Sequence, residues 1–100
     1  MKEVTVPSLE VSAPNTAKVY LPTLTMFFSY TTCVGFRSNK HGYVFTDKTY
    51  SNTTARHMKS VFMCNKEDKV PHEEFEAKLQ EALWEVYTNP AAGDYKQWQP

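Results

Sequence analysis

The stretch SNTTARH, residues 51–57, gathers the side chains of this chain that are best suited to holding an anion. Hydroxyl and amide groups come first, and a guanidinium and an imidazole follow. The apolar pattern from Met58 to Phe62 predicts that the stretch begins a helix over 52–63, with Ser51 or Asn52 as its N-cap. Because the free backbone N–H groups of a helix start carry a partial positive charge, anions bind there readily.

This helix start favours a phosphate-bearing, nucleotide-like ligand. The predicted ligand-binding residues are Ser51, Asn52, Thr53, Thr54, Arg56 and His57, together with Tyr30, Thr32 and Arg37 on the preceding strand. The alternative is ordinary capping, in which Thr54 is buried and His57 bonds a carbonyl group. Capping is the commoner reason for such a pattern, but it needs only one or two of four consecutive polar residues.

No catalytic residue is predicted, and the protein is not expected to be an enzyme. His41, His57 and His72 have no acid–nucleophile motif around them. A Cys33–His57 pair is the one catalytic arrangement to consider, but the apolar surroundings of Cys33 indicate a core thiol. The cysteine and histidine spacings match no metal-site motif, so neither a metal nor another cofactor is expected.

The first half of the chain predicts β-structure. Residues 1–22 contain three prolines and indicate an N-terminal arm or edge hairpin. Residues 24–48 predict a long β-hairpin. In it, 24–37 forms one strand with a bulge or bend near Tyr30–Thr32, and 43–48 is the returning strand.

The second half predicts another helix, over 71–88, followed by a tail over 89–100. The helix has an apolar stripe at helical spacing, formed by Phe75, Leu79, Ala82, Leu83 and Val86. In the tail, Tyr95 and Trp98 suggest docking on this subunit or another. Residues 1–100 are therefore expected to form a single α+β domain, a small antiparallel sheet with two helices packed on one face.

Charge is distributed unevenly along a chain whose net charge is zero. Residues 31–66 hold a basic set against a single acid, Asp47; the set is Arg37, Lys40, Lys48, Arg56, Lys59 and Lys66. Residues 71–88 hold an acidic set against Lys78; it is Glu73, Glu74, Glu76, Glu81 and Glu85. The domain is therefore expected to have a basic part and an acidic helix.

The cellular setting follows from what the chain lacks. The N-terminus has no long apolar region, no apolar run approaches the length of a membrane span, and the two cysteines have no disulfide-framework spacing. We therefore expect an intracellular protein without membrane contact. Nucleic acid is a weaker prediction, because the sequence pI of about 6.8 is low for a nucleic-acid-binding domain.

Two short motifs carry a resemblance to a known family. They are a Tyr-x-Thr-x-Val strand at Tyr30, Thr32 and Val34, and a Ser-x-Thr-Thr-x-x-His helix start at Ser51, Thr53, Thr54 and His57. Together with the segment VPHEEFEAKLQEAL, they resemble a small family of unknown function encoded in tailed-phage genomes. The resemblance covers about residues 24–85. It implies a phage origin and a role in the cytoplasm of an infected bacterium, and it supplies no activity.

Two functions remain open. The first is a non-enzymatic phage accessory protein, serving host takeover or counter-defence, that binds a small anionic, nucleotide-like ligand at the helix start. The second is an inhibitor or adaptor that acts on a host defence protein through the acidic helix, the arm or the tail. Either one is expected to form a homo-oligomer, because its charges are segregated and both ends of the chain resemble docking segments.

Overall fold

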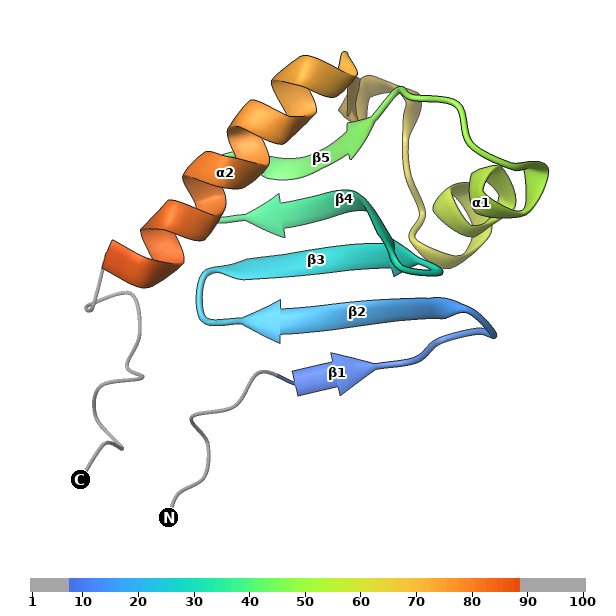
Figure 1. Ribbon diagram of the computed structural model, residues 1–100, viewed down its shortest axis with the longest axis horizontal. Helices are drawn as coiled ribbons and strands as arrows, with labels where there is room; N and C mark the ends of the chain where they lie inside the picture. Colours follow the sequence, from blue (N-terminus) through green and yellow to red (C-terminus); the bar gives the residue numbers. More distant parts are fainter. Residues whose placement is uncertain (1–7, 89–100) are drawn as a thin grey trace.

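A six-stranded sheet forms the centre of the computed structural model, which describes residues 8–88 (Figure 1). The strands are β1 (Ser8–Glu10), β2 (Thr16–Leu21), β3 (Leu24–Ser29), β4 (Thr32–Ser38), β5 (Gly42–Thr46) and β6 (Lys69–Val70). They lie side by side in chain order; the first five are antiparallel, and β6 runs parallel to β5. The sheet is therefore mixed, and the α+β class is confirmed.

Two helical segments accompany the sheet. The first combines α1 (Asn52–Arg56) with the π-helical turn η1 (His57–Val61), close to the predicted 52–63. The 3-10 turn η2 (Lys66–Asp68) then leads into β6, and α2 (His72–Thr88) follows. Neither helix in residues 8–88 has both the length and the apolar composition that crossing a membrane requires. The predicted tail, 89–100, lies outside the described residues.

The helices cover opposite faces of the sheet, and the prediction of both on one face is wrong. Val44 packs in a cluster with Phe75 and Ala82 of α2. Its neighbour Phe45 packs in a second cluster with Met58 of the α1–η1 segment and with Phe62, which directly follows that segment. Because successive residues of a strand point to opposite faces, these two clusters must lie on either side of the sheet. The prediction that both helices share one face failed because the α1–η1 segment packs against strand residues, such as Phe45, whose side chains point away from α2.

The expected single strand over 24–37 is also wrong, because the chain reverses at Tyr30. Two residues join β3 to β4, and Ser29 pairs with Thr32 across the turn. Tyr30 adopts a φ of 58°, the left-handed region that two-residue hairpin loops use and that glycine or asparagine usually fills. Its N–H donates to the carbonyl oxygen of Asn15 at 2.7 Å. That contact places the β1–β2 turn beside the β3–β4 turn.

A β-bulge in β4 sets the two apolar faces. Phe27 pairs with Gly35 but Phe28 pairs with Cys33, so Val34 is the extra residue. Val34 and Phe45 are fully buried in the α1-side cluster, whereas Phe36 is fully buried in the α2-side cluster.

The apolar stripe predicted for the second helix is confirmed. Phe75 and Ala82 are buried against the sheet, and Leu79, Leu83 and Val86 are partly buried beside them. Figure 1 shows α2 crossing the sheet, and it contacts β3, β4 and β5. On its surface, Glu74 and Lys78 form an i,i+4 ion pair at 3.2 Å.

Gly35 is a position where the fold tolerates no side chain. A Cβ there would overlap the ring of Phe45, which lies on the neighbouring strand and is fully buried. We therefore expect Gly35→Ala to lower the free energy of unfolding by about 1–3 kcal/mol through overpacking. Urea denaturation followed by circular dichroism measures the change.

Gly42→Asn is the matched control for this prediction. Gly42 has a φ of 70° but open space around its Cβ position, and asparagine accepts the left-handed region better than other residues with side chains. A Gly35→Ala protein as stable as the wild type would show that the Gly35–Phe45 contact does not limit packing.

Candidate functional site

Capping and packing account for three of the predicted site residues. Ser51 is the N-cap, and its Oγ accepts a hydrogen bond from the Thr54 N–H at 3.1 Å. The buried Oγ1 of Thr54 lies 2.9 Å from Oγ of Ser29, and that same Oγ lies 2.8 Å from Nδ1 of His57. A polar cluster of Ser29, Thr54 and His57 thus fastens α1 to the end of β3.

Ser29 and His57 have the spacing of a nucleophile and a base, but the serine lacks access to a substrate. The Ser29 side chain is only 1% exposed. It lies between the sheet and α1, with Thr54 as its other hydrogen-bond partner. The pair therefore contributes to the docking of the helix, where an unpaired buried hydroxyl would be costly.

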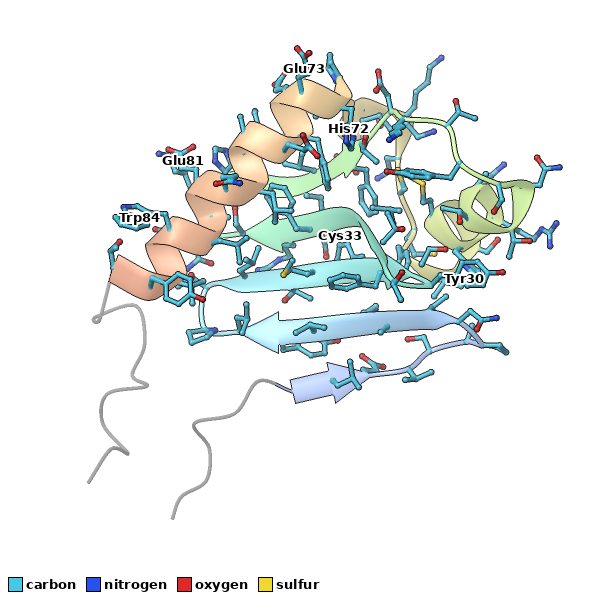
Figure 2. All side chains as sticks on the ribbon, in the orientation of Figure 1. Tyr30, Cys33, His72, Glu73, Glu81 and Trp84 are labelled. Carbon is cyan, nitrogen blue, oxygen red and sulfur yellow. The ribbon has the colours of Figure 1, made fainter. Side chains whose placement is uncertain are left out.

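Tyr30 and Thr32 lie beside α1 as predicted, and Arg37 does not. The Tyr30 ring stands 5.9 Å from the His57 ring, and Figure 2 shows Tyr30 at the end of the sheet next to α1. Thr32 pairs with Ser29. Arg37 is five residues further along β4, about 16 Å away at the rise of an extended strand. The continuous strand assumed from the sequence hid this separation.

Cys33 and His57 do not form the pair considered from the sequence. Cys33 packs in the α2-side cluster, and its thiol donates to the carbonyl oxygen of Gly35 at 3.3 Å. Burial raises the pKa of this thiol to about 11, so it stays protonated at neutral pH. His57 lies on the opposite face of the sheet.

One side of the α1 start opens into a cavity of about 560 Å³, which we call the lysine cavity. Its lining residues are Thr46, Asp47, Lys48, Thr49, Tyr50, Ser51, Asn52, Thr54, Ala55, Met58, Lys59, Cys64, Lys66 and Lys69. Three predicted site residues, Ser51, Asn52 and Thr54, belong to this set. Thr53, Arg56 and His57 do not line it.

The lysine cavity is strongly basic. Lys48, Lys59, Lys66 and Lys69 face a single carboxylate, that of Asp47. Within residues 8–88, the ion pairs involve other basic residues, and none of these four lysines takes part in one. The ammonium group of Lys48 lies 5.4 Å from the centre of the half-buried Tyr50 ring, a cation–π geometry.

Sequence reasoning missed the lysines as a group because they come from one loop and three separate elements. Lys48 precedes α1, Lys59 lies in η1, Lys66 begins η2 and Lys69 begins β6. The basic excess over 31–66 was the available signal. That range holds three of the four lysines and leaves out Lys69, and it gave no indication that these side chains converge.

Arg37 lines a second cavity, of about 530 Å³, which we call the sheet cavity. It is formed by Lys18, Tyr20, Thr25, Phe27, Arg37, Tyr43, Val61, Phe62, Met63, Asn65 and Asp68. The segment 58–69 therefore contributes residues to both cavities. In the part of the chain that the structure describes, no group of three or more acidic, histidine or cysteine side chains is arranged to hold a metal ion.

A family model matches residues 5–77, almost three quarters of the chain, and it describes a family of unknown function, DUF8033. The chain belongs to this family. No curated protein and no solved structure matches it. The DUF8033 match spans every residue that lines the lysine cavity and the sheet cavity, and it ends within the second turn of α2.

The hydrogen bonds of Ser29 generate a prediction about stability. We expect Ser29→Ala to lower the free energy of unfolding by about 1–3 kcal/mol, because Thr54 and His57 lose a partner in a buried setting. Ser60→Ala, at an exposed serine of η1, is expected to change it by less than about 0.5 kcal/mol. Urea denaturation of both variants checks this, and equal stabilities would contradict a fastening role for Ser29.

Proposed function

We propose that this DUF8033 protein binds a small anionic, nucleotide-like ligand in the lysine cavity and catalyses no reaction on it. The observation that carries the proposal is the set of four lysines around one cavity, none of them in an ion pair within residues 8–88. Four like charges that share a cavity with a single carboxylate repel one another, and an anion relieves that repulsion. The proposal keeps the ligand class predicted from the sequence and moves the site to one side of the helix start.

Size and lining chemistry support a nucleotide-like ligand. A volume of about 560 Å³ falls within the range of small-molecule sites. Lysine ammonium groups bind phosphates as point charges. The Tyr50 ring offers a face for a base, and the exposed Asn52 can hydrogen-bond a polar edge. We therefore assign the phosphates to the lysines and the base to the side of Tyr50.

The biological setting that we propose rests on the resemblance to tailed-phage proteins. In the cytoplasm of an infected bacterium, a protein that binds a nucleotide without converting it would sequester that nucleotide. Removing a nucleotide signal of host defence is one use of such a site.

Thermal stabilisation tests the proposed site. We expect one member of a nucleotide panel, with cyclic species included, to raise the melting temperature of the wild-type protein, because a ligand that binds only the folded state stabilises it. The double variant Lys59→Gln, Lys66→Gln should abolish the shift. Differential scanning fluorimetry with each nucleotide in excess provides the measurement.

Arg56→Gln is the matched control, since Arg56 is an exposed cation on α1 that does not line the cavity. It should keep the full shift. The proposal is contradicted if no nucleotide of the panel raises the melting temperature of the wild-type protein, or if the rise persists in the double lysine variant.

A second candidate function, binding a host protein, is favoured by the exposed face of α2. Trp84 is 67% exposed and Tyr87 is 82% exposed, and exposed large aromatic residues are typical anchors of protein interfaces. Figure 2 shows Trp84 near the C-terminal end of α2, on the side away from the sheet. Glu81 beside it forms contacts with Lys40 and His41, so Glu85 is the better residue to vary.

Affinity capture separates this candidate from the first. If α2 binds a host protein, Trp84→Ala with Glu85→Lys should remove that protein from the captured material, whereas Lys59→Gln with Lys66→Gln should retain it. Quantitative mass spectrometry of proteins captured from infected cells gives the readout. Equal capture by the wild type and the α2 variant would contradict an α2 interface.

A further inference from the structure

The α1–η1 segment leaves part of its face of the sheet open. Tyr20, Thr25, Arg37 and Tyr43 form a row across β2, β3, β4 and β5, because each residue pairs with the next in the strand register. Tyr20 is 38% exposed and Tyr43 is 53% exposed, and both line the sheet cavity. Two accessible aromatic rings thus stand on one sheet face.

Both rings are held in place by neighbouring side chains. The Tyr43 ring stacks on Phe27, with 6.3 Å between the ring centres and 12° between the planes. Phe27 is itself buried and stacks on Phe45 and Phe62. The Tyr20 hydroxyl donates to Oε1 of Glu10 at 2.5 Å. Because both rings are already held in place, the binding of a planar ligand costs little side-chain entropy.

Two cations lie on this part of the surface. Lys18 and Arg37 line the sheet cavity, and neither takes part in an ion pair within residues 8–88. Two carboxylates lie near these cations. Asp68 lines the cavity and accepts a hydrogen bond from the Asn65 N–H at 3.4 Å, and Glu10, opposite Lys18 in the strand register, accepts the one from the Tyr20 hydroxyl. The acidic residues of α2 belong to the other side of the sheet. The zero net charge of the whole chain does not exclude local contacts of phosphate with Lys18 and Arg37.

We infer that the open sheet face is a binding surface for single-stranded nucleic acid, with bases stacked on Tyr20 and Tyr43 and phosphates contacted by Lys18 and Arg37. Aromatic platforms flanked by basic side chains bind unpaired bases by stacking and the backbone by charge. A duplex hides its base faces and cannot use the rings. This function goes beyond the nucleotide proposal and uses a different cavity.

The spacing of the rings predicts a dependence on length. Tyr20 and Tyr43 are three strand spacings apart, about 14 Å. One base cannot stack on both, so an oligonucleotide that reaches both rings gains contacts that a mononucleotide lacks. An oligothymidylate of about eight nucleotides is a suitable probe, within the length range that small β-domains cover.

Fluorescence anisotropy of a labelled oligothymidylate at low salt tests the inference. We expect the wild type to bind it, and Tyr43→Ala to weaken binding about tenfold or more through the loss of one stacked base. Tyr43→Phe keeps the ring and should retain the affinity. Arg37→Gln should weaken binding and make the slope of log affinity against log salt shallower by about one.

Trp84→Ala is the matched control, because it removes an exposed aromatic ring from α2 and should leave binding unchanged. Circular dichroism melts show that each variant is folded. The inference is overturned if the wild type fails to bind the oligonucleotide, if folded Tyr43→Ala binds as tightly as the wild type, or if duplex DNA binds as tightly as the single strand. Loss of nucleotide binding in the lysine variants tests the other cavity alone.

Discussion

The contact between Phe45 and Gly35 is the constraint on which much of the structure depends. The Phe45 ring occupies the space that a side chain at Gly35 would need, and it stacks on Phe27, which in turn stacks on Phe62. That aromatic stack is the surface against which the α1–η1 segment packs. Phe62 is the last ring of this stack and directly follows η1, so its packing also fixes the position at which the chain leaves η1. Both cavities are bounded by that segment, so their shapes follow from a packing contact deep in the sheet.

The sheet separates charges as well as apolar clusters. Its α2 side has the glutamates of the long helix, and its other side has the lysines of the lysine cavity with Lys18 and Arg37 of the sheet cavity. The equal numbers of acidic and basic residues in the chain therefore do not describe the charged groups that a ligand contacts on either face. Short-range contacts with phosphate depend on the local arrangement of charged side chains more than on the net charge. The two faces can thus serve different partners.

The sequence was sufficient for elements that are determined locally. The Ser51 cap and the apolar stripe of α2 have a hydrogen-bonding or periodic signal within a few residues, and both are present. The turn at Tyr30 has no such signal, because a tyrosine replaces the usual glycine and its conformation is supported by distant contacts with Asn15 and His57. Because that turn was not predicted, the α+β class could be inferred from the sequence, but the distance between Arg37 and the helix start could not. The lysine cavity was out of reach for the same reason, since its cations converge only after β6 has paired with β5.

Within residues 8–88, the two strands at the borders of the sheet are short, β1 with three residues and β6 with two. A border strand exposes unpaired N–H and C=O groups, and a long one can recruit a strand from another molecule into a growing fibre. A protein with zero net charge lacks the mutual repulsion that keeps highly charged proteins apart in solution. Brief border strands remove the template for such growth, so this neutral fold gains its protection against aggregation from geometry where others gain it from charge.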